Sequence, residues 1–366
     1  MSRTVVLVGG GHAHVAALSD WIARGLPTGA RAVLLTPSPT LRYSAMVPGW
    51  IAGQHQAEDG VVPVAALAAR AGVELVLDTC VGVDPDARVV RTTRGYLSFD
   101  VVSFDTGGVA RSSTVIGSDP RLIEVRPLET MVDHLAALTA VSRVVVVGGG
   151  ASGVELAFAL RNRARAGVVP EVTLVTGRAG LLPDFAPAVQ RSAARALRRQ
   201  HIRVDHTDAR LVHGQLMSGN ESLEPVDVIV AALGSAAPDW VRASGLAIDA
   251  AGFIAVDAHQ RSLSHPHVYA AGDVSTRLEC PLARSGVHAV RAGAVLAANL
   301  RRAVAGQPPA ATYRPRRHSL YLLNTGDGSA IFSYGPWAVE GRWVLRLKHG
   351  IDRRWIAMHA VRALAP

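Results

Sequence analysis

The sequence predicts an α/β protein with two doubly wound, Rossmann-like domains and a small α+β unit towards its C-terminal end. The first observation is a repeat: an apolar run, three glycines and an Ala- and Leu-rich stretch begin at Val5 and again at Val144. The second is length, because 366 residues exceed the ~100 to 200 residues of a usual single domain. A chain of this size can bury a large ligand.

Each copy of the repeat is typical of the βαβ opening of a doubly wound sheet. The expected segments are a strand at 5–8, a helix at 16–23 and a strand at 32–35 in the first copy, and a strand at 144–147, a helix at 156–165 and a strand at 172–175 in the second. Both copies place their glycines between the first strand and the helix, where a phosphate-binding turn belongs.

Glycine is needed at such turns because the backbone must approach a pyrophosphate and pack tightly against the helix, whose N-terminus attracts the phosphates. The second copy carries all three glycines, at Gly148, Gly150 and Gly153. The first has Gly9 and Gly11, but His14 stands in the third place. Either helix and strand separate slightly there, or His14 points outward. Two turns in this context predict two dinucleotide sites.

Three further strand ends organise the chain. The run from His267 ends in Gly272 and Asp273, which places an acid at the edge of the sheet where ligands collect. Two similar runs end at Gly107 and Gly234, where the chain can leave one domain for the other. The predicted division is a discontinuous first domain at 1–112 and 237–312, a second domain at 113–236 and a third unit at 313–366.

The third unit is expected to contain short strands and one helix, and to form a lid over the first domain. Turn residues separate its apolar runs. The predicted segments are strands at 319–324, 330–334 and 342–347, followed by a helix at 348–363.

Composition excludes several classes of protein. The 38 basic residues, 37 Arg and the single Lys348, exceed the 29 acidic residues and give a net charge of +9. The arginines are spread along the chain, so we expect no nucleic-acid partner. Cys80 and Cys280 form no close pair and are interpreted as structural. His12 and His14 have no neighbouring Cys or carboxylate, so we expect no metal site. Without an apolar run long enough to cross a bilayer or a signal-like start, a cytoplasmic location is expected.

These signals, in this order, resemble the pyridine nucleotide-disulfide oxidoreductase superfamily, in which an NAD(P) domain is inserted into an FAD domain. The match is most similar to type II NADH dehydrogenase-like flavoproteins and to the flavoprotein module fused to selenide, water dikinase. The segments behind this narrower resemblance are 9–15, 43–53, 322–328 and 351–355.

The resemblance implies that Gly9 and Gly11 hold the FAD pyrophosphate and that Asp273 binds the ribityl chain or a phosphate. It places Met46-Val47-Pro48 along the isoalloxazine ring, and the N-terminus of a helix at 282–303 at the pyrimidine edge of the flavin. His12 would lie beside the flavin or its phosphates, and His288 either tunes the flavin or packs the helix. The expected cofactor contacts are Gly9, Gly11, His12, Ala13, Met46, Val47, Gly107, Gly272, Asp273, Val287, Gly148, Gly150, Ser152, Gly153, Arg178 and Gly234.

The resemblance also implies an NAD(P)H oxidoreductase in which Glu155 and Pro48 are the catalytic residues. Glu155, placed in the first turn of its helix, either reaches the nicotinamide and flavin or only complements the helix dipole. No redox cysteines stand near Pro48, so two electrons would pass from the flavin directly to a quinone or another small acceptor. Two alternatives remain open, a slow redox-sensing or scaffold protein and a reductase of a selenium or sulfur compound.

The two nucleotide strands depart from the usual pattern. Each normally ends in an acid that binds ribose hydroxyls, but here they end in Thr36 and Thr176. In the second site, the missing acid and the nearby Arg178 favour a 2′-phosphate, hence NADPH over NADH.

The helix predicted from Lys348 carries Ile351, Trp355 and Met358 at helical spacing, which predicts one apolar stripe. Its expected basic flank is Lys348, Arg353, Arg354 and Arg362, with Arg342 and Arg346 just before. One interpretation is contact with an anionic membrane, which would make the protein peripheral on the inner face. The other is docking of the stripe on the first domain.

Overall fold

In the computed structural model, residues 2–138, 141–163, 168–282, 284 and 286–364 are described. The first sheet is parallel and has the strand order β19-β9-β1-β2-β5. Its strands are β1 (Arg3–Val8), β2 (Ala30–Thr36), β5 (Glu74–Leu77), β9 (Val101–Phe104) and β19 (Val268–Ala270). β1 is central, pairing Val8 with Leu35 of β2 on one side and with Phe104 of β9 on the other.

Alternate residues of β1 face two different layers. Val5 and Leu7 pack under helices α1 (His12–Arg24), α3 (Val64–Arg70) and α9 (Gly286–Val304). Val6 and Val8 face a small antiparallel sheet and helix α8 (Asp239–Arg242). The strands of that sheet are β6 (Cys80–Asp84), β7 (Val89–Thr92) and β8 (Tyr96–Ser98).

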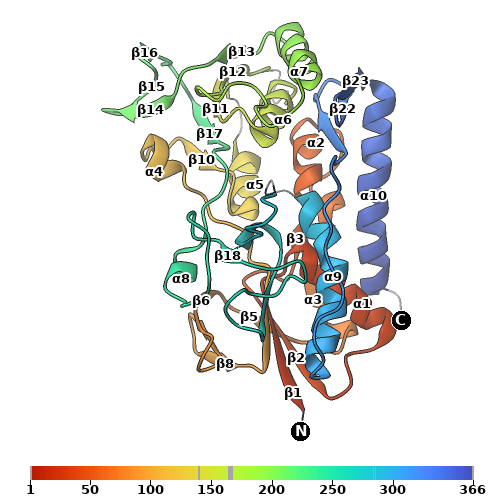
Figure 1. The fold of residues 1–366 in the computed structure, drawn as a ribbon. Helices are drawn as coiled ribbons and strands as arrows, with labels where there is room; N and C mark the ends of the chain where they lie inside the picture. Colours follow the sequence, from red (N-terminus) through yellow and green to blue (C-terminus); the bar gives the residue numbers. More distant parts are fainter. Residues whose placement is uncertain (1, 139–140, 164–167, 283, 285, 365–366) are drawn as a thin grey trace.

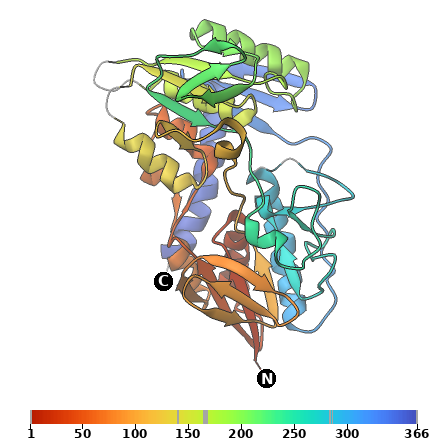
Figure 2. The same cartoon turned by 90° about the vertical axis from the view of Figure 1, so that its left-hand side faces the viewer.

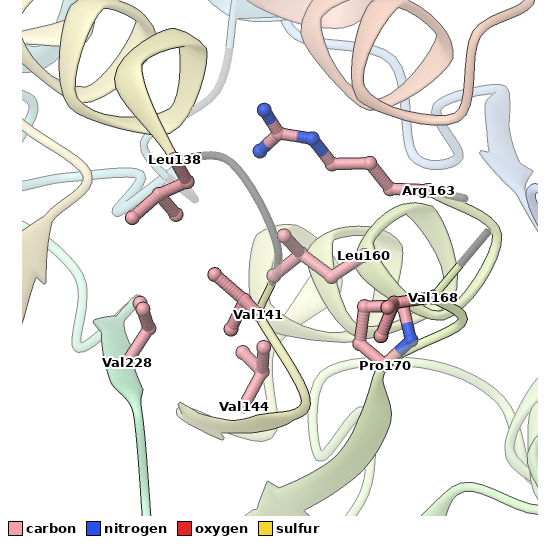
Figure 3. A pocket seen from close by; sticks show the side chains of 8 residues that line it. All are labelled: Leu138, Val141, Val144, Leu160, Arg163, Val168, Pro170 and Val228. Carbon is pink, nitrogen blue, oxygen red and sulfur yellow. The ribbon is translucent and has the colours of Figure 1, made fainter. Parts of the chain in front are cut away.

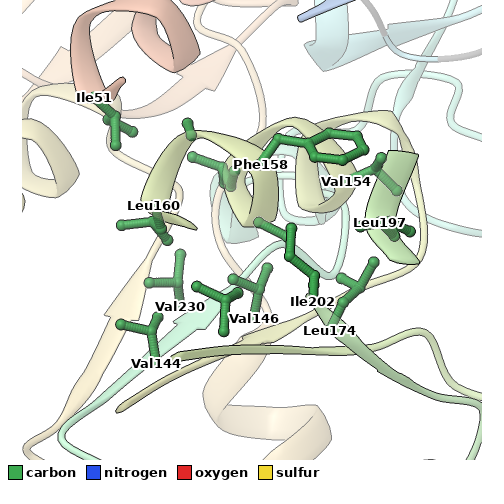
Figure 4. Close-up of a cluster of buried hydrophobic side chains, with 14 of the residues drawn as sticks. Ile51, Val144, Val146, Val154, Phe158, Leu160, Leu174, Leu197, Ile202 and Val230 are labelled. Carbon is green, nitrogen blue, oxygen red and sulfur yellow. The ribbon is translucent and has the colours of Figure 1, made fainter. Parts of the chain in front are cut away.

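The second sheet is also parallel, in the order β10-β17-β11-β12-β13. Its strands are β10 (Leu122–Glu124), β11 (Arg143–Val147), β12 (Glu171–Val175), β13 (Arg203–Asp205) and β17 (Val228–Ala231). One face packs on α5 (Leu128–Ala137), α6 (Ala151–Arg161) and α7 (Pro187–Arg199), as Figure 4 shows for Val146, Val230 and Phe158. The other face packs on α4 (Ser112–Ile116) and on β14 (Ala209–Val212) and β15 (Gln215–Ser218). Strand β16 (Glu221–Ser222) pairs with the far edge of β15.

The two parallel sheets confirm the predicted α/β class. Figure 2 shows the unit around the second sheet stacked above the unit around the first. The chain crosses between them twice, and the two crossing segments meet in an antiparallel bridge between Val109 and Ala236. The domain boundaries at 112 and 236 remain a prediction.

Short elements complete the connections. They are β3 (Leu41–Arg42), the 3-10 turns η1 (Ser44–Met46), η2 (Glu58–Gly60) and η3 (Gly272–Val274), α2 (Val47–Ile51), β4 (Val61–Val62), β18 (Ile254–Ala255) and β20 (Ser275–Thr276). Helix α6 begins at Ala151 and ends at Arg161, so the predicted start at 156 is wrong, and the predicted end at Arg165 lies outside the described residues. Helix α9 begins at Gly286 rather than at Leu282.

The C-terminal unit differs from the prediction in its third strand. It has strands β21 (Tyr321–Asn324), β22 (Ala330–Tyr334) and β23 (Trp337–Gly341), and then α10 (Arg342–Leu364). The predicted strand at 342–347 is therefore wrong. Val344 and Leu345 are both buried, although neighbours in a half-buried strand would alternate. Adjacent buried residues instead fit a helix, which begins as soon as β23 ends.

Helix α10 runs down from the end of β23 at the top of the view in Figure 1. It contacts α1 and α3 of the first unit, while β22 and β23 contact α7 of the second. The C-terminal unit therefore packs against helices of both units. None of the helices that the structure describes combines the length and apolar character needed to cross a bilayer.

Candidate functional site

The first glycine turn joins β1 to α1 at the carboxyl edge of the first sheet. Gly9 has a φ of +95°, and a Cβ at this position would lie 2.4 Å from the carbonyl oxygen of Asp105. Only glycine fits both the backbone conformation and the space. Gly11 precedes α1, whose first N–H groups therefore point out of the turn.

Asp105, just after β9, approaches the first turn of α1. Its Oδ2 accepts hydrogen bonds from the N–H groups of Ala13 at 2.7 Å and His14 at 3.0 Å. The residue is 4% exposed, and burial raises the pKa of its carboxyl to about 7. Asp105 was not predicted as a site residue, although an acid at the end of a strand is the signal that identified Asp273.

His14 does not point outward, so that alternative is wrong. Its ring is fully buried, with Nδ1 2.6 Å from the Gly9 carbonyl oxygen and Nε2 2.8 Å from Ser103 Oγ. Because a carbonyl only accepts, Nδ1 carries the proton and Nε2 accepts from the Ser103 hydroxyl. Burial lowers the pKa of His14 to about 4, so the ring is neutral. A Cβ on Gly153, the matching residue of the second turn, would lie 1.9 Å from Gly148 O, so the first turn must be wider there.

His12 presents a ring nitrogen without a partner. Its Nε2 is buried and makes no hydrogen bond, while its ring lies 5.6 Å from Tyr43 and 5.3 Å from Trp355. Burial lowers the pKa of His12 to about 4. A buried polar atom with no protein partner fits a bound ligand. Together with the glycine turn, it marks this edge of the sheet as a candidate ligand site.

The strand-end residues gather around the same turn. A Cβ on Gly272 would lie 2.5 Å from Asp105 Oδ1, so the 3-10 turn η3 touches the end of β9. Next to it, Asp273 Oδ2 accepts a hydrogen bond from Arg126 at 2.5 Å. A Cβ added to Gly107 would lie 3.7 Å from Nη1 of Arg126, so the two residues are neighbours. The structure therefore brings Gly9, Gly11, Gly107, Gly272 and Asp273 together.

The segment expected beside the flavin forms η1 and the start of α2. Met46, Val47 and Pro48 are buried. Gly286, the first residue of α9, lies against Ser44, because a Cβ added to this glycine would be 3.9 Å from the serine Oγ. Val287 follows it in the first turn of α9, so the helix begins beside this segment. Further along, His288 Nδ1 lies 2.7 Å from the hydroxyl of Tyr313.

Glu155 lies one turn into α6, so its predicted place in the first turn is wrong, and with it the helix-dipole interpretation. Its Oε1 accepts a hydrogen bond from the N–H of Asn324 in β21 at 2.8 Å. Desolvation raises the pKa of Glu155 to about 7, although the positive charge of Lys348 opposes the shift.

Lys348, the single lysine of the chain, is buried in α10 and does not belong to a basic flank. Its Nζ donates to the Ala45 carbonyl and to Asp352 Oδ2, each at 2.8 Å. Asp352 also accepts a hydrogen bond from Tyr43. Asp352 was not predicted as a site residue, and its only signal in the sequence is its spacing of four residues from Lys348. This lysine fixes the backbone immediately before Met46.

The predicted apolar stripe of α10 is also wrong. Trp355 is 8% exposed and stacks on Tyr43 with ring centroids 4.4 Å apart, while Ile351 and Met358 are exposed. Trp355 therefore docks on the first unit, as one of the two interpretations expected. Four exposed apolar residues, Trp343, Leu347, Ile351 and Met358, recur along α10 at helical spacing, and Trp337 of β23 is also exposed. The side chain of Arg362 lies outside the described residues.

The second glycine turn, between β11 and α6, has the form of the first. A Cβ on Gly148 would lie 2.3 Å from the Ala232 carbonyl, whereas a Cβ on Gly150 would meet nothing within 4 Å. Ser152 and Gly153 follow in the first turn of α6, and Gly234 has a φ of +78° where the chain leaves β17. The turn is open to a phosphate.

Arg178 projects from the end of β12, with a side chain 89% exposed. Its Nε lies 3.2 Å from Asp208, which also accepts the N–H of Arg178 at 3.1 Å. An acid thus shares this edge with the arginine predicted to meet a 2′-phosphate.

Other features lie away from both turns. A pocket between Val144, Val228 and Leu160 opens at the amino ends of β11 and β17, opposite the glycine turns (Figure 3). Cys80 and Cys280 are free thiols. Within the described residues, no group of three His, Cys, Asp or Glu side chains is placed to hold a metal.

Comparison with known proteins identifies the family. Residues 3–293 match the model of the pyridine nucleotide-disulphide oxidoreductase family. A nitric oxide reductase FlRd-NAD(+) reductase of Aeromonas salmonicida is 29% identical over 204 residues, which cover 52% of this chain and 50% of the relative. The chain spans about half the length of such curated relatives. An oxidoreductase of Pestalotiopsis fici is 25% identical over 364 residues, with 93% of each chain covered.

Solved structures support the same fold. The sulfide:quinone oxidoreductase of Aquifex aeolicus superposes with a TM-score of 0.77 at 18% identity, covering 100% of this chain and 93% of the other. The two glycine turns, the strand ends around them and the match over residues 3–293 agree with one another. The chain therefore belongs to the pyridine nucleotide-disulphide oxidoreductase family.

Proposed function

We propose that the protein is an FAD-dependent oxidoreductase that takes two electrons from NAD(P)H and passes them to a quinone or another small acceptor. The observation that carries the proposal is the meeting of three elements beside the Met46 segment. Helix α6, which carries Glu155, contacts α2 at this segment, Lys348 of α10 donates to the Ala45 carbonyl, and the first residue of α9 lies against Ser44. When bound, FAD supplies the redox chemistry itself.

The residues of the chain hold and shield this chemistry. Gly9, Gly11 and the first turn of α1 would hold the pyrophosphate, with Asp273 at the ribityl chain or a phosphate. Gly148, Gly150 and α6 would hold the second nucleotide. The buried Met46, Val47 and Pro48 would exclude water from one side of the ring.

We further propose that no disulfide takes part. Neither Cys80 nor Cys280 belongs to the segment around Pro48, where the disulfide members of the family carry their redox pair. Burial also raises the pKa of the Cys80 thiol to about 11, which keeps it protonated and unreactive. Electrons would then pass directly from the flavin to the acceptor.

Rapid-mixing spectroscopy tests the proposal. Purified protein should carry non-covalent FAD that acid precipitation releases, and anaerobic NADH or NADPH should bleach the visible absorbance of the oxidised flavin. A decylubiquinone solution should then restore the colour. Protein that neither contains FAD nor takes it up would refute the proposal, whereas bleaching without reoxidation would refute the quinone acceptor.

We also propose contact with an anionic membrane through the exposed Trp343, Leu347, Ile351 and Met358 of α10 and the exposed Trp337 of β23. Two tryptophans are suited to headgroup depth, and Arg342, Arg346, Arg353 and Arg354 of α10 supply positive charge near them. Such a contact would favour a quinone acceptor, because long-tailed quinones partition into lipid.

A further inference from the structure

A carboxylate lies at the helix end that should attract phosphate. Asp105 Oδ2 accepts the N–H groups of Ala13 and His14, and a Cβ on Gly11 would lie 2.4 Å from the same oxygen. The N-terminus of a helix favours one anion, because its free N–H groups and dipole point outward. Asp105 thus already uses two of the donors that an incoming pyrophosphate would seek.

The internal repeat shows that this carboxylate is not part of the turn itself. A Cβ added to Gly9 would lie 2.4 Å from the carbonyl oxygen of Asp105. A Cβ added to Gly148 would lie 2.3 Å from the carbonyl oxygen of Ala232, so the two carbonyl groups lie in matching places. Ala232 therefore occupies the matching place in the second turn and leaves it open. In the proposed function both turns bind a pyrophosphate, but only the first turn has a carboxylate at the N-terminus of its helix. The carboxylate is therefore not needed to form such a turn.

The surroundings of Asp105 make its charge unfavourable once a second anion arrives. Burial and the charge of Asp273, from η3, raise the pKa of Asp105 to about 7, while the two N–H groups of α1 act against the shift. Arg126 is engaged by Asp273 at 2.5 Å. His12 and His14 of α1 are neutral, because burial lowers the pKa of each to about 4. Ser103 and Phe104, which precede it in β9, carry no charge.

We propose that Asp105 couples FAD binding to the uptake of one proton, so that a neutral carboxyl and the pyrophosphate share the N-terminus of α1. The inference rests on the proposed binding of FAD at this turn. The sign follows from linkage: FAD favours the protonated carboxyl, so affinity is full below about pH 7 and falls as pH rises, by up to about tenfold per pH unit.

Titration of apoprotein with FAD tests this coupling without measuring turnover. The dissociation constant is read from flavin fluorescence over a range of about two pH units centred near 7, and calorimetry in buffers of different ionisation enthalpy counts protons. Wild-type protein should take up close to one proton per FAD above pH 7. Asp105→Asn keeps an oxygen that can accept the two N–H groups, and it should bind FAD with no pH dependence and no proton uptake.

Asp100→Asn is the matched control, because the Asp100 carboxylate accepts the N–H of Thr4 at 2.7 Å at the opposite end of β9. This variant should keep the wild-type dependence on pH. FAD binding by wild-type protein without proton uptake, or an unchanged pH dependence in Asp105→Asn, would overturn the inference. If Asp105→Asn does not fold, the wild-type proton count alone decides. Wild-type protein that binds no FAD at any pH would overturn both the inference and the proposed function.

Discussion

The carboxylate of Glu155 accepts a hydrogen bond from the N–H of Asn324 at 2.8 Å, and so joins α6 of the second unit to β21 of the C-terminal unit. Glu155→Gln keeps an accepting oxygen but removes the charge. We expect the variant to retain its FAD and to reduce the flavin at least about tenfold more slowly with NAD(P)H. The wild-type rate should change around pH 7, where Glu155 ionises, and the variant rate should not.

Stopped-flow absorbance with excess NADPH measures these rates. Glu171→Gln is the control, because Glu171 lies at the start of β12 with a side chain 82% exposed. Equal rates and equal pH profiles for wild type and Glu155→Gln would leave Glu155 with a structural role only.

Acid should destabilise the protein through His14. Its folded pKa of about 4 lies below the usual 6.5, so the neutral ring contributes stability above pH 6.5 that is lost as pH falls towards 4. A shift of this size corresponds to about 3 kcal/mol. His14→Gln should be less stable than wild type at pH 7, and the difference should shrink on acidification.

Urea unfolding at several pH values measures the effect. His134→Gln, at an exposed position of α5, should unfold like wild type throughout. A constant difference between His14→Gln and wild type from neutral to acidic pH would show that His14 is not held neutral.

The buried pair of Lys348 and Asp352 should be strongly coupled. Each side chain is 7% exposed, so Lys348→Met leaves an unpaired buried carboxylate and should lower the free energy of unfolding by about 3 to 5 kcal/mol. Lys348→Met/Asp352→Leu removes both charges and should recover most of this loss. Chemical denaturation of the wild type, both single variants and the double variant completes the cycle. Additive losses would contradict the coupling.

Arg178→Ala should weaken NADPH binding more than NADH binding, because only NADPH carries the 2′-phosphate. Asp208→Asn should have the opposite effect, since Asp208 lies 3.2 Å from the same guanidinium and competes with the phosphate. Dissociation constants of both nucleotides, measured by fluorescence with each variant, check the pair. Equal losses for NADH and NADPH in Arg178→Ala would remove the preference for NADPH.

Membrane contact should depend on Trp343 and Ile351. Trp343→Ser/Ile351→Ser should abolish sedimentation with anionic vesicles, while Tyr96→Ser, a substitution of another exposed ring on β8, should not. High salt should weaken the wild-type interaction because it screens arginine from lipid headgroups. Flavin absorbance confirms that each variant is folded. Wild-type protein that stays in the supernatant with every vesicle would exclude the contact.

Local pattern predicted the parts of the fold that depend on neighbouring residues. The strand, glycine and helix order at Gly9 and Gly148 and the acid after β19 are local signals, and all three lie where ligands collect in a parallel sheet. The start of α6 was predicted too late, because the residues from Ala151 to Val154 continue the glycine turn in sequence although they already belong to the helix.

Contacts between distant segments could not be predicted in this way. Asp105 caps α1 across 92 residues, and Lys348 reaches the Ala45 carbonyl across 303. Nothing in the spacing of α10 indicates that Lys348 is buried and Ile351 exposed, because only the packing against α3 and β4 decides which face is covered. Of the three residues predicted to form one apolar stripe, this packing buries Trp355 and leaves Ile351 and Met358 exposed.

Because Lys348 is buried, chemical modification of its amine can report the opening of helix α10. Because no other lysine exists in the sequence, amine-reactive reagents find no other side-chain amine to modify. Lys348 becomes accessible only when α10 separates from the segment around Ala45. The rate at which mass spectrometry detects acylation of Lys348 in the native protein therefore reports how often α10 detaches, separately from global unfolding.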